Sequence, residues 1–169
     1  MFEILSSEEA FRCPFFVITK YGCVDENKKH HDYYVHEAPD SSHILCLTKE
    51  GKLVLVREYY LPTRETSLHF PGGTIEKGET AMEAAVRELK EETGLKVPAM
   101  KHLYTIAKDP GYSAGRMHVF LAKDAEQESE PENDIVLLTP QEVKEAIDKG
   151  EMNCAPCMAA FSRAVDLRI

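Results

Sequence analysis

The sequence predicts an α/β domain with a mixed β-sheet and an N-terminal β-strand extension. Near the N-terminus, two β-rich runs, CPFFVITKYGCV and HHDYYVHEA, flank the polar DENKK and predict a hairpin or paired strands. Further strand-like runs precede and follow a long central helical pattern. Two more helical patterns come after the last strand, and this order of strands and helices is typical of the α/β class.

Local patterns predict the elements of the main body. SSHILCLT and KLVLVREYY flank KEGK and predict a hairpin. HLYTIA and GRMHVFLAK predict a second strand pair around KDPGYSAG, and DIVLL predicts a short strand. One helix is expected to start near Pro140, and another covers APCMAAFSRAVDL with Pro156 in its first turn. We assign residues 1–40 to an N-terminal β-strand segment and residues 41–169 to the main domain.

Composition limits the classes of function. Of the 169 residues, 43% are hydrophobic, which is enough for a core, and the net charge is −9. This charge argues against a nucleic-acid binder with a basic patch. It does not argue against a small phosphate-bearing substrate, because bound cations can bridge the carboxylates of a protein and the phosphates of a substrate. No apolar run is long enough to span a membrane, and MFEILSSEEAF does not resemble a signal peptide. We therefore expect a cytoplasmic protein without a membrane partner.

The segment GGTIEKGETAMEAAVRELKEETGL, residues 72–95, predicts the longest helix and contains six glutamates. Thr80 and Glu83 fit a capping box, and Gly94 fits a left-handed C-cap. The three-and-four spacing predicts a buried face formed by Met82, Ala85, Val86 and Leu89.

Three glutamates lie on the other side of this helix, at positions 88, 91 and 92. Carboxylates suit a hard divalent cation, and Gly72 and Gly73 would let backbone carbonyls approach it closely. Cations held there would bind a diphosphate and activate a water molecule. On spacing alone, a merely solvated acidic face is the more frequent explanation of this pattern.

The complete string favours a cation site over a merely solvated acidic face. From Gly73 the chain contains glycine, five residues, Glu79, seven residues, then RELKEETGL. This string resembles the Nudix box, the signature of hydrolases that act on nucleoside diphosphates linked to another group. The resemblance implies an α/β/α sandwich in which the box forms a loop, a helix and a loop. It also implies that Arg87 orients the glutamates and that Glu79 helps to hold the box together.

The same resemblance implies bound Mg²⁺, with Mn²⁺ as the alternative. Its implied ligands are the carbonyl of Gly72 and the carboxylates of Glu88, Glu91 and Glu92. Upstream, YYVHEAPDSSHILCLTKEGKLVLVREYYLPTRETSLHFPGG is similar to ADP-ribose pyrophosphatases, and Pro110 lies fifteen residues after the box, as in that subgroup. This similarity implies hydrolysis of a nucleoside diphosphate sugar, with ADP-ribose giving AMP and ribose 5-phosphate. It further implies a homodimer in which the N-terminal strands reach the partner's substrate pocket.

Some positions depart from the subgroup. Tyr60 stands where relatives commonly have Arg, His69 where they tend to have Glu, and Gly115 where an acid is frequent. These departures leave open another substrate, such as GDP-mannose or a dinucleotide, and a sensor that binds a nucleotide without cleaving it. The candidate substrate-binding residues are Arg57, Tyr60, Arg64, His69, Pro110, Tyr112 and Arg116. The alternatives are surface arginines and tyrosines at the edge of the core.

The general base in this subgroup is usually a Glu in the loop after the HVFLA strand. Here that loop is KDAEQESEPEND, and its candidate bases are Glu126, Glu128, Glu130, Glu132 and Asp134. We favour Glu132 because it lies just before DIVLL, and a mobile loop would let it close over the substrate. A purely solvated loop is the alternative.

One cysteine pair, Cys154 and Cys157 in CAPC, also invites an interpretation. Two thiols supply only half of a tetrahedral zinc site, and no convincing second pair completes it. The sequence therefore favours an ordinary pair at a helix start over a metal or redox site.

Overall fold

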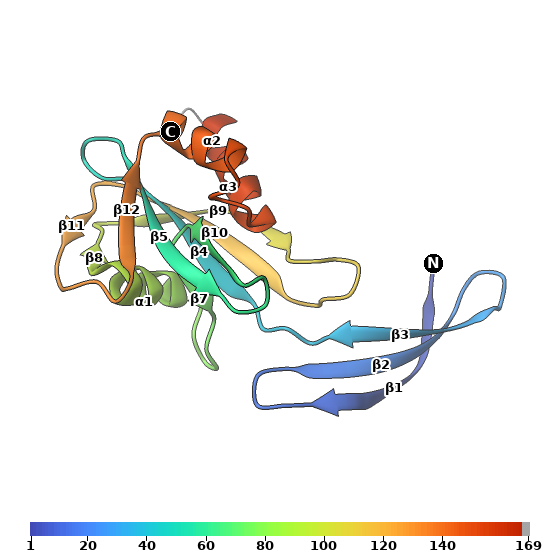
Figure 1. The fold of residues 1–169 in the computed structure, drawn as a ribbon. Coiled ribbons are helices and arrows are strands. Elements are labelled where there is room, and N and C mark those ends of the chain that lie inside the picture. The colour runs from blue at the N-terminus through green and yellow to red at the C-terminus, as the bar shows by residue number, and fades with distance from the viewer. Residues whose placement is uncertain (167–169) are drawn as a thin grey trace. The chain divides into compact units, whose positions relative to one another are not determined.

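The computed structural model describes residues 1–166, which form two compact units (Figure 1). One unit contains Met1–Asp40 together with Ile106–Arg116. The other contains Ser41–Thr105 and the chain from Met117 onward. The assignment of residues 1–40 and 41–169 to separate domains stays a prediction.

The first unit contains an antiparallel sheet in the order β1-β2-β3. Its strands are β1 (Glu3–Arg12), β2 (Val17–Val24) and β3 (His30–His36). The predicted pairing around DENKK is confirmed as the β2–β3 hairpin. Its turn forms because the Asp25 carboxylate accepts the backbone N–H groups of Asn27 at 2.8 Å and Lys29 at 3.0 Å.

A mixed four-stranded sheet has the order β7-β4-β10-β9, and most of its residues belong to the second unit. Its strands are β4 (Ser41–Cys46), β7 (Gly72–Thr74), β9 (Met100–Ala107) and β10 (Arg116–Ala122). β4 pairs parallel with β10 and antiparallel with β7. The predicted pairing of HLYTIA with GRMHVFLAK is confirmed, as is the mixed sheet.

A second sheet in this unit has the order β12-β5-β6, with all pairs antiparallel. Its strands are β5 (Leu53–Tyr60), β6 (Glu65–His69) and β12 (Asp134–Leu138), and a small pair is formed by β8 (Leu95–Lys96) and β11 (Glu126–Gln127). The predicted hairpin of SSHILCLT with KLVLVREYY is wrong. Only one bridge, Leu47 to Leu53, joins these runs. Both edges of β4 are taken by β7 and β10, and both edges of β5 by β6 and β12.

Helices lie on both sides of these strands, with α1 on one side and α2 and α3 on the other (Figure 1). Their bounds are α1 (Ala81–Thr93), α2 (Pro140–Asp148) and α3 (Ala155–Asp166). The helix expected near Pro140 is confirmed, and Leu167 of the last predicted helix lies outside the described residues. Among those residues, no helix combines the length and apolarity needed to cross a membrane.

The buried face of α1 differs from the predicted one. Ala85 and Leu89 are buried as expected, but Met82 is 37% exposed and Val86 is 52% exposed. Ala84 and Thr93 are buried instead. Because α1 packs against β4 and the glycine-containing strand β7, small side chains fit this contact better than Met or Val. The inward face is thereby rotated toward the side that carries Glu88 and Glu92.

Candidate active site

The box helix starts and ends as its sequence predicts. The Thr80 hydroxyl accepts the Glu83 N–H at 3.2 Å, and the Glu83 carboxylate accepts the Thr80 N–H at 2.8 Å. This reciprocal capping box satisfies two backbone donors at the helix start. At the other end, Gly94 adopts the left-handed conformation, with φ 66°, and donates its N–H to Lys90. These two ends fix the register in which the box glutamates face their surroundings.

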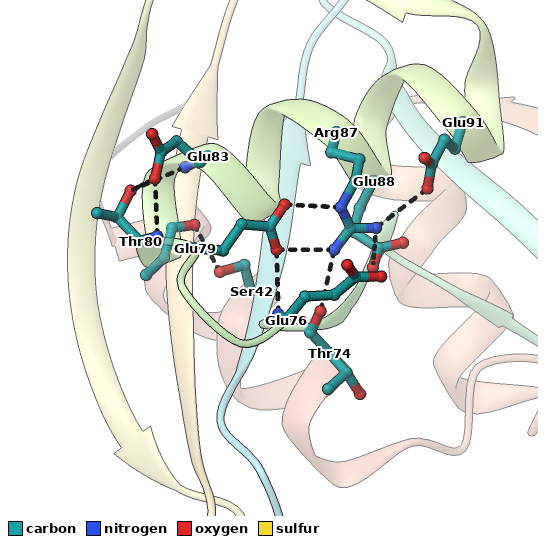
Figure 2. Close-up of polar contacts among 10 residues, drawn as sticks. Ser42, Thr74, Glu76, Glu79, Thr80, Glu83, Arg87, Glu88 and Glu91 are labelled. Atoms are coloured by element: carbon teal, nitrogen blue, oxygen red, sulfur yellow. Dashed lines mark hydrogen bonds and ion pairs between the residues drawn. The ribbon is translucent and has the colours of Figure 1, made fainter.

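Arg87 lies at the centre of the polar contacts around this helix (Figure 2). Its guanidinium donates two hydrogen bonds to Glu79, at 2.8 and 3.0 Å, and one to the carbonyl of Thr74 at 3.1 Å. It also donates to Glu88 at 2.9 Å and to Glu91 at 3.0 Å. The hydrogen bonds to Glu79 are the largest cause of the raised pKa of Arg87. Arg87 therefore joins the loop before the helix to two of its glutamates.

Glu88 and Glu92 are partly buried box carboxylates whose pKa values burial raises. Burial raises the pKa of Glu92 to about 7, although its carboxylate accepts the Gly72 N–H at 2.9 Å. Burial also raises the pKa of Glu88, against the lowering effect of the hydrogen bond from Arg87. A partly buried carboxylate is costly to ionise without a nearby cation. Both carboxylates are therefore suited to binding one.

The two glycines of the FPGG loop lie against these carboxylates and the adjacent strand. A Cβ at Gly73 would overlap the Glu88 carboxylate. A Cβ at Gly72 would overlap the backbone of Ser42 and His43, and Gly72 has φ 153°. The backbone therefore requires glycine at position 72, whereas a side chain at position 73 would displace the Glu88 carboxylate.

The carboxylate oxygens of Glu88 and Glu92 are donors of the kind that a hard divalent cation prefers. Within the described part of the chain, no three His, Cys, Asp or Glu side chains converge as a preformed metal cluster. The carboxylates of Glu88 and Glu91 instead face Arg87.

Contacts in the acidic loop separate its five candidate bases. Glu126 pairs with Lys49 at 2.7 Å, Glu128 with Lys90 at 2.9 Å, and Asp134 with Arg57 at 3.3 Å. Glu130 and Glu132 instead line a cavity of about 280 Å³, together with Arg87, Lys90, Glu91 and Ser129.

The backbone also fixes this loop against the box helix. The N–H of Glu132 donates to the carbonyl of Glu91 at 3.2 Å, and that of Asn133 donates to Glu92 at 3.1 Å. Glu132 is thus brought next to the box.

Four of the candidate substrate-binding residues lie on or between β5 and β6. Arg57 is exposed and pairs with Asp134. The rings of Tyr60 and His69 meet edge to face, with centroids 5.4 Å apart. Arg64 lies in the turn between the strands, with φ 58°, and donates its N–H to the Tyr60 carbonyl.

The sequence interpretation missed Glu58. Its carboxylate lies 3.1 Å from Nε2 of His69, and burial lowers the pKa of that histidine. The charge of Glu58 also contributes to the raised pKa of Glu92. The available signal was the position of Glu58, which follows the apolar run LVLV and Arg57 and precedes two tyrosines.

The other three candidates belong to the first unit. Pro110 and Tyr112 line a cavity of about 440 Å³ that also includes Tyr21, Tyr33 and Glu37. The N–H of Arg116 donates to Asp40 at 2.8 Å.

Gly115 packs tightly on the loop after β3. Its missing side chain has a physical reason, because a Cβ there would lie 2.9 Å from the Pro39 carbonyl and 3.0 Å from Ala38. An acidic side chain at this position would therefore require this loop to shift.

Comparison with known proteins decides the family. A model of the NUDIX domain matches residues 38–159, which include the whole box. The chain belongs to the Nudix family. The solved structure of an ADP compounds hydrolase has the same fold, with a TM-score of 0.87 and 24% identity, and the match covers 98% of this chain and 93% of that one. The predicted Nudix-type α/β/α fold is confirmed.

Curated relatives match the Nudix chain over shorter lengths. The methanol dehydrogenase activator of Bacillus methanolicus is 35% identical over 85 residues, which are 50% of this chain and 46% of that protein. The ADP-ribose pyrophosphatase of Bacillus subtilis is 35% identical over 86 residues, or 51% of this chain and 46% of its own. The chain thus spans about half the length of these relatives. Hydrolases of the family generally use divalent metal ions, in agreement with the donor set described above.

Proposed function

We propose that this Nudix protein is a Mg²⁺-dependent hydrolase that cleaves the diphosphate linkage of a nucleoside diphosphate sugar. ADP-ribose, giving AMP and ribose 5-phosphate, is the first candidate substrate. One observation carries the proposal: the complete box folds so that the partly buried carboxylates of Glu88 and Glu92 lie against Gly73 and Gly72. The similarity to an ADP-ribose pyrophosphatase and to an ADP compounds hydrolase supports the substrate class.

Four residues are proposed to hold the cation. Glu88 and Glu92 provide the main ligands, and Glu91 and the Gly72 carbonyl complete the set. Mn²⁺ is the alternative ion, because it prefers the same oxygen ligands. When bound, the cation neutralises charge on the diphosphate and makes an attacking water more acidic.

Other residues of the site position groups or move a proton. Arg87, held by Glu79, keeps the carboxylates of Glu88 and Glu91 in place. Glu132 takes the proton of the attacking water, a role supported by its place in the cavity beside Glu91. The proton leaves the oxygen as that oxygen bonds to phosphorus, and the other phosphate leaves with the bridging oxygen.

Substrate recognition is assigned to polar and aromatic residues outside the box. Arginines bind phosphate and tyrosines can stack on a base. The proposed contacts are made by Arg57, Tyr60, Arg64, His69, Pro110, Tyr112 and Arg116.

We also propose a cytoplasmic homodimer in which residues 1–40 contact the partner. Support comes from exposed apolar side chains on β1, where Ile4 is 63% and Phe11 is 53% exposed. Light scattering during size-exclusion chromatography tests the dimer, and an unchanged monomer mass at micromolar concentration would count against it.

A substrate panel tests the function. ADP-ribose, GDP-mannose, NADH, a dinucleoside polyphosphate and a nucleoside triphosphate are incubated with Mg²⁺, and the products are separated by chromatography. We expect ADP-ribose to give AMP and ribose 5-phosphate, with activity lost in EDTA. Glu92→Gln should lose most activity, whereas Glu83→Gln on the same helix should retain it because Gln also completes a capping box. Equal turnover in these two variants would remove the metal assignment.

The departures at Tyr60 and His69 motivate a second candidate, a Nudix-fold sensor that binds a nucleotide without cleaving it. The same panel distinguishes the two functions. Ligand-dependent thermal stabilisation with no product from any substrate would favour the sensor. Cleavage confined to GDP-mannose or a dinucleotide would retain the enzyme class and change the substrate.

A further inference from the structure

The CAPC segment lies at the start of α3 in a defined arrangement. The helix begins at Ala155, so Cys154 precedes its first residue and Cys157 belongs to its first turn. The carbonyl of Cys154 accepts the N–H of Met158 at 3.0 Å, which makes Cys154 the N-cap residue. Side chains of a helix point toward its N-terminus, and the thiol of Cys157 therefore points back toward Cys154.

The two thiols have different environments. Cys157 is 2% exposed, whereas Cys154 is only partly buried. A hydrogen bond from the Cys157 thiol lowers the pKa of Cys154 to about 7, and the same contact with burial raises the pKa of Cys157. The pair thus contains one partly buried cysteine that forms a thiolate readily and one fully buried cysteine held beside it. This division suits an attacking and a resolving thiol.

We propose that Cys154 and Cys157 form a redox-active dithiol that low-molecular-weight disulfides oxidise to an intramolecular disulfide. This reactivity is separate from diphosphate hydrolysis. The structure disfavours a metal site, because in the described residues no third His, Cys, Asp or Glu joins the pair in a metal-binding group.

The reaction balances as two exchanges. The Cys154 thiolate attacks one sulfur of a disulfide RSSR, forms a mixed disulfide and releases RS⁻. The Cys157 thiol then gives its proton to the released thiolate and attacks the sulfur of Cys154, which expels the second RS⁻. Two electrons pass from the cysteine pair to RSSR, whose two halves leave as RSH after protonation.

Glutathione disulfide is the probe for the test. The reduced, full-length protein is incubated with it at pH 7, quenched with acid and analysed by intact mass and peptide mapping. We expect the wild-type peptide that contains both cysteines to lose two hydrogens and retain no glutathione. Cys157→Ser should instead retain one glutathione on Cys154. Cys154→Ser should neither lose two hydrogens nor retain glutathione. Cys13→Ser serves as the matched control, because Cys13 is another partly buried cysteine and should not matter.

A rate measurement gives a second readout that needs no variant. At pH 7 a thiol with a pKa of about 7 has about 16-fold more thiolate than an ordinary cysteine, and its lower nucleophilicity offsets this about fourfold. Iodoacetamide should therefore alkylate Cys154 about fourfold faster than a short cysteine peptide. A wild-type protein that stays reduced, or one that stably retains glutathione on Cys154, would overturn the proposal. Circular dichroism confirms that each variant is folded before its result is used.

Discussion

Arg87 and Glu79 are joined by two hydrogen bonds, from Nε to Oε1 at 2.8 Å and from Nη2 to Oε2 at 3.0 Å. Glu79 precedes α1 and Arg87 lies in its middle, so this pair fixes the entering loop against the helix. The remaining guanidinium nitrogen, Nη1, is shared between Glu88 and Glu91. One cation thus holds the loop and positions two of the proposed metal ligands.

The first prediction concerns the fork geometry of Arg87. Lysine retains the charge but cannot donate two parallel hydrogen bonds to Glu79 while also reaching Glu88 and Glu91. Arg87→Lys should therefore lower kcat by about 10- to 100-fold, the usual effect of losing a residue that orients metal ligands. The KM for ADP-ribose should change much less. Steady-state kinetics at saturating Mg²⁺ check this, with Arg163→Lys on α3 as the control. A loss confined to KM would contradict a positioning role.

The second prediction concerns acid pH. The hydrogen bond from Arg87 holds the pKa of Glu79 below its ordinary value of 4.5. A carboxyl with a depressed pKa in the folded state stabilises the fold above its unfolded pKa, and this stabilisation is lost as the pH falls through the folded pKa. Urea unfolding should therefore show wild type more stable than Glu79→Gln at pH 7, with the difference shrinking from pH 5 toward pH 3. A difference that is constant across this range would exclude the ion pair as its source.

The third prediction separates two adjacent glycines. In Gly73→Ala the new Cβ meets the end of the flexible Glu88 side chain, which can move away. The fold should survive, whereas Mg²⁺ affinity and activity should fall. In Gly72→Ala the Cβ meets backbone atoms of Ser42 and His43, so the fold itself should lose about 1–3 kcal/mol or more. Thermal unfolding with and without Mg²⁺ tests both variants. Normal Mg²⁺-dependent stabilisation of Gly73→Ala would argue against Glu88 as a ligand.

The predictable parts of this site are those whose chemistry is local. Thr80, Glu83 and Gly94 define the ends of α1 through contacts within a few residues, and the structure confirms all three. The buried face was harder to predict, because apolar character alone placed Met82 and Val86 inward. The surface that meets the helix comes partly from β4, which is distant in the sequence, and partly from the glycine-containing β7, and it accepts small side chains there.

Strand pairing was also only partly predictable from local sequence patterns. The turn between β4 and β5 forms locally, with Thr48 and Lys52 hydrogen-bonded at 2.9 Å. The sheets that receive these strands depend on β7, β10 and β12, which lie far along the chain from their partners, and on β6, which forms a hairpin with β5. Glu58 was missed because its contact with His69 depends on the register of the β5–β6 hairpin, which pairs Val56 with His69.

The last prediction concerns the acid that removes the proton. Among the loop acids, Glu132 and Glu130 line the cavity beside Glu91, whereas Glu128 is paired with Lys90 and Lys96. If Glu132 is the base, Glu132→Gln should lower kcat at least about 100-fold and remove the rise of kcat with pH on the acid side. The affinity for Mg²⁺ should stay the same, because the variant leaves the box intact.

Two matched variants make this test decisive. Glu130→Gln carries the same charge change in the same cavity, and Glu128→Gln carries it at an acid already paired with lysines. Both should retain most of the wild-type kcat and its pH dependence. If Glu130→Gln instead loses the acid-side rise while Glu132→Gln keeps it, the base is Glu130. The loop would then present Glu130, two residues before Glu132, to the attacking water.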